Sequence, residues 1–239
     1  MYIIKRKRIS LILIALMLGI FVYSYENQKL DTDEQTQSTT ATPVSGKVIV
    51  VDAGHGVPDE GAQSSRGTTE AETNLKISLK LQNLLEQSGC TVILTRSDEN
   101  AIYDLDKTTL REKKISDIRN RVKIGNNASA DLFVSIHLNK IPQQQYWGWQ
   151  CFYNSKNEKS VNLAKKIQAN LNESIQKDNK RVAMKLDTVY IMKHVEIPIS
   201  IVECGFLSNP EEEQQLLDDE YQNKLAWGIF NGIIEYFNE

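Results

Sequence analysis

The chain has 239 residues, of which 41% are hydrophobic and 25% are charged, with 12 glycines and 5 prolines. These fractions are those of an ordinary globular protein and exclude collagen, a coiled coil and a wholly disordered chain. The formal net charge is −3. Because Lys5–Arg8 are all basic, the rest of the chain is more acidic than this total, and electrostatic capture of nucleic acid is not expected. Three widely spaced cysteines, Cys90, Cys151 and Cys204, are too few for a disulfide framework and are expected to be buried free thiols.

The first 25 residues have the pattern of an export signal. Lys5–Arg8 precede the uncharged apolar run Ile9–Tyr25, which a surface helix of a globular protein would not tolerate on all its faces. The run is intermediate in length between a signal-peptide core and a full membrane span, so residues 1–25 are either a signal peptide or an uncleaved membrane anchor. Tyr23 and Tyr25 stand where a signal peptidase prefers small side chains, which favours the anchor. The positive flank predicts that the rest of the chain is exported.

A polar segment separates this run from the remainder. Residues 26–46 contain almost no apolar side chains and cannot repay the entropy of ordering, so they are expected to form a flexible linker. Residues 47–239 have the length of one domain with a sizeable core.

Within this domain, strand and helix patterns alternate. Continuous apolar runs predict four buried strands, at residues 47–51, 91–95, 132–136 and 199–202. Helical spacing of apolar residues predicts helices around residues 72–88, 115–124, 161–175 and 225–237, and a further strand is expected at 189–192. This order predicts an α/β fold: an open, mostly parallel, twisted sheet flanked by helices on both faces, in a single domain.

Ligands of such sheets bind beyond the carboxyl ends of the strands. His55 follows the first predicted strand, His137 the third and Glu203 the fourth. Glu70 opens the first helix behind a glycine-containing loop, with Glu72 as the competing choice. Two imidazoles and two carboxylates are therefore expected to converge on one edge of the sheet.

Two imidazoles and one carboxylate are a common catalytic zinc set, in which a fourth position is left for water and a second carboxylate serves as general base. Two other interpretations stay open on the pattern alone. In one, His55 caps a turn and His137 only packs; in the other, Glu70 and Glu203 are the paired carboxylates of a glycoside hydrolase. The third histidine, His194, is interpreted as a solvated loop residue.

Seven short motifs in this order resemble the zinc-dependent N-acetylmuramoyl-L-alanine amidases (amidase type 3), over about residues 47–237. They are Asp52–Gly56, Gly61–Ala62, Gly67–Glu70 with Asn74–Leu75, Thr95–Arg96, Ala130–Asp131, Ser135–Asn139 and Val202–Asn209.

The resemblance implies a role for each site residue. It places the zinc ligands at His55, Glu70 and His137 and the catalytic glutamate at Glu203, and Asn74 selects Glu70 over its neighbour. The implied cofactor is Zn²⁺. The implied reaction is hydrolysis of the amide bond between N-acetylmuramic acid and the L-alanine of the peptidoglycan stem peptide.

Two further stretches, residues 136–153 and 189–198, resemble the subgroup that acts in spore cortex maturation and leads to muramic-δ-lactam. This likeness implies an extracytoplasmic enzyme of the forespore intermembrane or cortex space, with peptidoglycan as substrate and the membrane as partner through the N-terminal segment. Whether an extracytoplasmic activator or accessory protein takes part stays open. The alternatives are a general wall-remodelling amidase and a catalytically silent peptidoglycan-binding or partner-binding protein.

Overall fold

The computed structural model describes residues 17, 19, 20, 23 and 42–238. The predicted export segment 1–25 and the predicted linker 26–46 lie for the most part outside these residues. In the part of the chain that is described, no helix is both long and apolar enough to cross a membrane. The residues from Thr42 onward form one compact unit.

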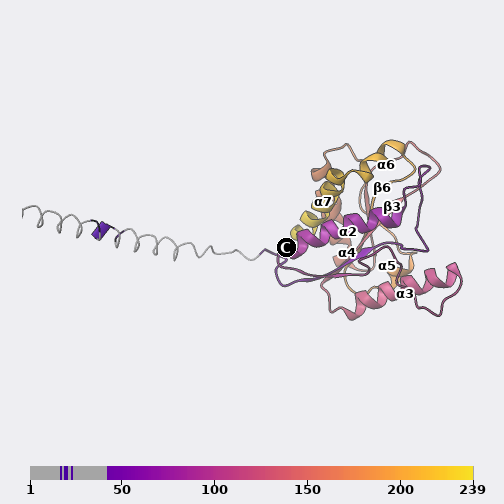
Figure 1. Ribbon diagram of the computed structural model, residues 1–239, viewed down its shortest axis with the longest axis horizontal. Coiled ribbons are helices and arrows are strands. Elements are labelled where there is room, and N and C mark those ends of the chain that lie inside the picture. Colours follow the sequence, from indigo (N-terminus) through magenta and orange to yellow (C-terminus); the bar gives the residue numbers. More distant parts are fainter. Residues whose placement is uncertain (1–16, 18, 21–22, 24–41, 239) are drawn as a thin grey trace, which may run out of the picture. The chain divides into compact units, whose positions relative to one another are not determined.

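In this unit, strands and helices alternate along the chain (Figure 1). The strands are β1 (Val48–Ala53), β2 (Thr91–Leu94), β3 (Leu132–Asn139), β4 (Gln150–Tyr153), β5 (Met184–Lys185) and β6 (Ile199–Phe206). The helices are α2 (Glu70–Gln87), α3 (Leu110–Asn127), α4 (Glu158–Ile175), α5 (Tyr190–His194), α6 (Pro210–Leu217) and α7 (Asp219–Phe237).

The strands form one sheet in the order β2-β1-β3-β6-β4-β5. Strand β1 pairs in parallel with β2 and β3, and β3 pairs in parallel with β6. Strand β4 runs antiparallel to β6, and the short β5 lies at the edge, parallel to β4. The mostly parallel α/β sheet predicted from the sequence is confirmed, whereas β4 and β5 were not predicted.

Helices cover both faces of the sheet, so its central strands are apolar on both sides. On one face, Ile49 and Val51 of β1 belong to a core shared with α2, α4 and α7. On the other face, Val50 and Phe133 pack with residues of α3 and α5. Figure 1 shows α2 and α7 on one side and α3 and α5 on the other. The alternation of strands and helices thus leaves the carboxyl ends of β1, β3 and β6 side by side at one edge.

The structure corrects one predicted element. Residues 189–192, expected to form a strand, belong instead to helix α5 and the residue before it. The backbone N–H of Lys193 donates to the oxygen of Val189, and that of Val195 to the oxygen of Ile191. Ile191, Met192 and Val195 are buried at helical spacing. So short an apolar run does not distinguish a strand from a single buried helical turn.

The packed unit also begins earlier than residue 47. Val44 is fully buried, and the backbone N–H of Gly46 donates to the oxygen of Gly89 at 2.8 Å. The thiol of Cys90 donates to the oxygen of Val44 at 3.3 Å. The last residues of the predicted linker therefore pack beside the turn that joins α2 to β2.

Candidate active site

Four side chains gather at the carboxyl edge of the sheet. His55 follows β1 in a loop, and Glu70 is the first residue of α2. His137 and Glu203 lie within β3 and β6, which run further than predicted, and the two residues are paired in register. Parallel pairing of β3 with β6 therefore places the second histidine directly beside the second carboxylate.

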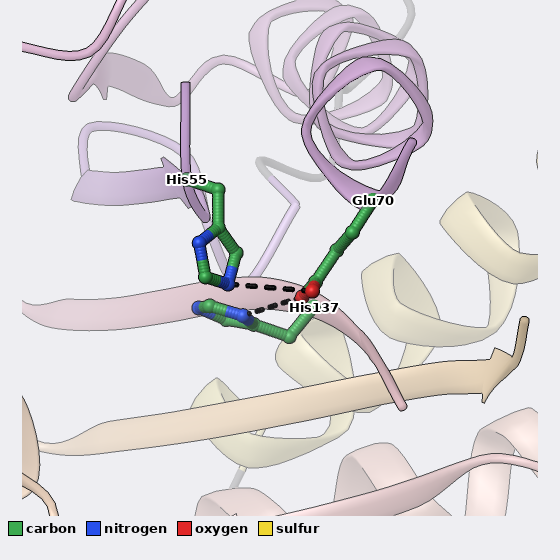
Figure 2. A group of neighbouring side chains, drawn as sticks. All are labelled: His55, Glu70 and His137. Carbon is green, nitrogen blue, oxygen red and sulfur yellow. Dashed lines mark hydrogen bonds and ion pairs between the residues drawn. The ribbon is translucent and has the colours of Figure 1, made fainter. Parts of the chain in front are cut away.

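His55, Glu70 and His137 form one tight cluster (Figure 2). Nε2 of His55 lies 3.3 Å from Oε2 of Glu70, and Nδ1 of His137 lies 2.9 Å from Oε1. One nitrogen from each histidine and one carboxylate oxygen lie within 4.8 Å of one another. The single carboxylate of Glu70 thus stands between the two imidazoles.

The backbone fixes the carboxylate of Glu70 in this position. The N–H of Leu138 donates to Oε1 at 3.0 Å and the N–H of Ala62 to Oε2 at 2.9 Å. The side-chain amide of Asn74 donates to the oxygen of Gly54 and to Oε1 of Glu70. Burial would raise the pKa of Glu70, but the hydrogen bonds with the two histidines outweigh it and hold that pKa well below its usual range. The carboxylate of Glu70 is therefore held in a fixed orientation between the two imidazoles.

Two glycines make room for the cluster. A Cβ on Gly54 would overlap the ring of His137. Gly61 has φ +71°, and a Cβ there would lie 2.5 Å from Oε2 of Glu70 and 2.7 Å from the ring of His55. The two loop backbones that approach the site therefore require glycine.

A buried ion pair supports the loop that carries His55. The guanidinium of Arg121 lies 2.6 Å from Oδ1 of Asp52 and also donates to the backbone oxygen of His55 at 2.6 Å. Ser135 and Thr95 donate their hydroxyls to the same Asp52 carboxylate. His55 itself has φ +63°, which is uncommon for a residue other than glycine. Arg121 thus holds His55 in a strained backbone conformation.

The other ring nitrogen of His55 faces a residue that sequence reasoning missed. Nδ1 lies 3.2 Å from Oδ2 of Asp59. Burial lowers the pKa of His55, but its hydrogen bonds with Asp59 and Glu70 outweigh burial and raise the pKa to about 9. No pattern in the sequence identifies this contact, because it depends on the turn in which Gly56 and Asp59 exchange backbone hydrogen bonds.

Glu203 lines a cavity of about 240 Å³ together with His55 and His137. Apolar residues form much of the remaining wall: Ile118, Leu186, Val189, Ile191 and Ile201. Burial raises the pKa of Glu203 to about 7, an effect that the nearby charge of His137 only partly offsets. Its Oε2 atom is buried and has no hydrogen-bond partner among the described residues. Glu203 is therefore poised to exchange a proton near neutral pH.

The structure keeps the competing residues away from the cluster. Glu72 is exposed and pairs with Lys76. His194 is exposed at the end of α5, rather than in a loop, and its ring stacks on Tyr190 at 3.9 Å between centroids. Arg96 donates to four backbone oxygens, including that of Asp98, so it supports the scaffold.

The donors suit a divalent metal. Imidazole nitrogen and carboxylate oxygen are common ligands of catalytic zinc, and such sites pair the metal with a nearby unligated base. The cluster supplies two nitrogens and one carboxylate, and Glu203 lies beside His137 with an unpartnered oxygen. The arrangement can hold a metal ion and can take up a proton next to it.

Comparisons with known proteins agree with this chemistry. The model of the N-acetylmuramoyl-L-alanine amidase family matches residues 49–235. A germination-specific N-acetylmuramoyl-L-alanine amidase of Bacillus subtilis (strain 168) is 34% identical over 236 residues, covering 98% of this chain and 96% of that protein. The N-acetylmuramoyl-L-alanine amidase LytC of the same strain is 30% identical over 82% of this chain and 36% of its own length.

Solved structures show the same fold. The CwlD amidase from Clostridioides difficile, solved in complex with the GerS lipoprotein, has a TM-score of 0.79 and 42% identity over 81% of this chain and 99% of its own. The catalytic domain of the amidase CwlV from Bacillus (Paenibacillus) polymyxa has a TM-score of 0.69 and 32% identity, covering 80% of this chain and 98% of that domain. The chain therefore belongs to the N-acetylmuramoyl-L-alanine amidase family.

Proposed function

We propose that this amidase is zinc-dependent, cuts the bond between N-acetylmuramic acid and the L-alanine of the peptidoglycan stem peptide, and acts in spore cortex maturation. The observation that carries the chemistry is the cluster of His55, Glu70 and His137, with Glu203 in the cavity that the two histidines also line. Family membership supplies the bond that is cut.

We assign His55, Glu70 and His137 as the zinc ligands. When bound, zinc polarises the amide carbonyl and lowers the pKa of a water molecule. The assignment rests on the donor set, on the ionised state of Glu70 and on the space left by Gly54 and Gly61. Among the residues that the structure describes, this is the only group of three or more His, Cys, Asp or Glu side chains placed to hold a metal ion.

Glu203 is assigned as the general base and then the general acid. It accepts a proton from the attacking water, and it returns that proton to the amine of L-alanine as the C–N bond breaks. Its pKa of about 7, raised by burial, matches both steps. The apolar wall that includes Ile201 and Val189 limits water around this carboxylate.

The assignment of the histidines can be tested with a matched set of variants of the full chain. We expect His137→Ala to lose stoichiometric zinc and release of stem peptides from purified peptidoglycan. His194→Ala is the control, because it removes the remaining histidine, which is exposed and outside the cluster. Elemental analysis measures zinc, and mass spectrometry of the digest identifies the bond that is cut. Unchanged zinc in His137→Ala would contradict the ligand set.

The spore role is supported by the germination-specific relative, which aligns with nearly the whole chain. We expect spores of a strain that lacks the gene to have a cortex without muramic-δ-lactam and to germinate poorly, while vegetative growth stays near normal. Wild-type δ-lactam in such spores, or vegetative cells that stay in unseparated chains, would instead indicate a general wall-remodelling amidase.

For location and partners, we propose an enzyme exported by residues 1–25 and held at the outer face of the forespore membrane. A similar amidase was solved together with a lipoprotein, so an extracytoplasmic accessory lipoprotein is the partner we propose. Affinity purification from sporulating cells with tagged wild-type protein, followed by mass spectrometry, tests this. Recovery of no membrane-associated partner would argue that the enzyme acts alone.

A further inference from the structure

The ring of His55 lies between two carboxylates. Its Nε2 atom lies 3.3 Å from Oε2 of Glu70, inside the cluster, and its Nδ1 atom lies 3.2 Å from Oδ2 of Asp59, outside it. Both Asp59 and His55 line the cavity that holds Glu203. The side chain of Asp59 therefore reaches the site without belonging to the ligand cluster.

The backbone holds Asp59 firmly in place. Asp59 and Gly56 exchange two backbone hydrogen bonds, of 2.8 and 3.0 Å. Val57, one of the two residues between them, donates its backbone N–H to the oxygen of Glu99 at 2.8 Å and accepts from that of Ala101 at 3.0 Å. Four main-chain hydrogen bonds thus hold this tight turn and its contact with a second loop, and they fix the backbone from which the Asp59 side chain extends.

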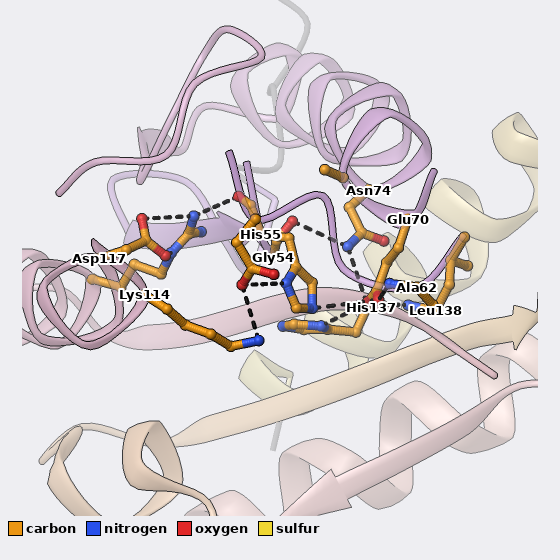
Figure 3. Close-up of polar contacts among 12 residues, drawn as sticks. Gly54, His55, Ala62, Glu70, Asn74, Lys114, Asp117, His137 and Leu138 are labelled. Atoms are coloured by element: carbon orange, nitrogen blue, oxygen red, sulfur yellow. Dashed lines mark hydrogen bonds and ion pairs between the residues drawn. The ribbon is translucent and has the colours of Figure 1, made fainter. Parts of the chain in front are cut away.

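Helix α3 contributes a second restraint. Nζ of Lys114 lies 3.0 Å from the same Oδ2 atom that faces His55. Figure 3 shows the side chain of Lys114 extended toward His55. The Asp59 side chain is 22% exposed, whereas that of Lys114 is 59% exposed. The same carboxylate oxygen of Asp59 thus accepts from the ammonium group of Lys114 on one side and faces Nδ1 of His55 on the other.

A carboxylate acceptor decides which ring nitrogen carries the proton. Because a carboxylate oxygen accepts, its partner at Nδ1 of His55 is an N–H, and Nε2, which faces Glu70, is the ring nitrogen left for a metal ion. His137 is oriented by β3, whereas His55 sits in a loop at φ +63°. Of the two histidines, His55 is the one that needs a further restraint.

We propose that Asp59 is a positioning residue that fixes the tautomer and the ring orientation of His55 for metal binding. This inference rests on the proposed zinc site. Carboxylate partners of this kind typically raise metal affinity about 10- to 100-fold.

The first test measures zinc affinity of the full chain by competition with a chelator of known affinity. We expect Asp59→Ala to weaken zinc binding about 10- to 100-fold and Asp59→Asn, which keeps a hydrogen-bond acceptor, to weaken it less. Asp106→Ala is the matched control, since Asp106 pairs with Lys107 on the surface, is 71% exposed and does not line the cavity. Zinc affinity within about twofold of wild type in both Asp59 variants would overturn the inference.

The second readout is the histidine tautomer, measured by ¹⁵N NMR of the full zinc-loaded chain. The chain has only 3 histidines, so His194→Ala identifies the signals of His194, and the other two rings differ because Nε2 of His55 but Nδ1 of His137 faces Glu70. We expect protonated Nδ1 and metal-bound Nε2 at His55 in the wild type, and a mixture or the opposite pattern in Asp59→Asn, whose amide can also donate. An unchanged tautomer in Asp59→Asn together with unchanged affinity would leave Asp59 as a turn residue only.

The two proposals fail in different ways. If wild-type protein binds no zinc, the proposed metal site is wrong. If the wild type binds zinc, His137→Ala loses it and Asp59→Ala retains it at full affinity, only the role of Asp59 is wrong.

Discussion

Replacing Glu203 by glutamine should stabilise the metal-free protein at neutral and alkaline pH. Burial raises the pKa of Glu203 from 4.5 to about 7. The fold therefore disfavours the ionised carboxylate, and its stability is unaffected well below pH 4.5 and falls as the pH rises through both values. A shift of roughly 2.5 units corresponds to about 3 kcal/mol once the carboxyl is fully ionised.

Glutamine is similar in shape and does not ionise, so it removes this penalty. Relative to the wild type, we expect Glu203→Gln to gain about 1 kcal/mol at about pH 5 and about 3 kcal/mol at about pH 8, apart from a constant offset. Urea unfolding of chelator-treated protein measures the free energy of unfolding at each pH. Glu72→Gln, on an exposed side chain, is the control and should show no such trend. A pH-independent difference between Glu203→Gln and the wild type would refute the buried, high-pKa carboxyl.

Three other predictions concern the scaffold and the metal. Gly54→Ala should lower zinc affinity and peptide release at least about 10-fold, because the added Cβ would overlap the ring of His137. Its helix content, measured by circular dichroism, should stay unchanged, and zinc affinity equal to that of the wild type would contradict the close packing. Arg121→Met should lower the free energy of urea unfolding by about 3 to 5 kcal/mol, because it leaves buried Asp52 unpaired; exposed Arg119→Met is the control, and equal effects would disprove this role. Chelation should lower the melting temperature of the wild type, and added zinc should restore it, because zinc binds the folded state; no shift would argue against a specific site.

Much of the fold follows from local sequence patterns. The runs at β1, β3 and β6 are apolar without alternation because helices cover both faces of the sheet. Thr69 caps α2, with its hydroxyl accepting from the backbone N–H of Glu72, so the helix begins at Glu70, the residue expected to open it, just before the apolar pattern of residues 72–88.

Other elements depend on tertiary contacts that a single sequence does not reveal. Strand β5 has two exposed residues and exists only through its pairing with β4. Helix α5 is a single turn whose buried residues contact the face of the sheet that α3 also covers. Neither element has enough periodicity to identify its type.

The residues of the candidate site also differ in whether the sequence alone identifies them. His55, His137, Glu70 and Glu203 could be chosen because polar residues follow buried strands or open the first helix. Asp59 could not be chosen in this way, because its contact with His55 depends on a turn that Val57 joins to a second loop. The raised pKa of Glu203 likewise depends on burial by neighbouring elements.

The most direct test of the central claim compares the same substitution at the two carboxylates. Glu70→Gln and Glu203→Gln are each measured for bound zinc and for stem-peptide release from peptidoglycan. We predict that Glu70→Gln loses both, whereas Glu203→Gln retains stoichiometric zinc and loses turnover by about 10²- to 10⁴-fold, as expected for a general base. Loss of zinc from Glu203→Gln with retention in Glu70→Gln would reverse the two roles, and full activity in Glu203→Gln would contradict the mechanism.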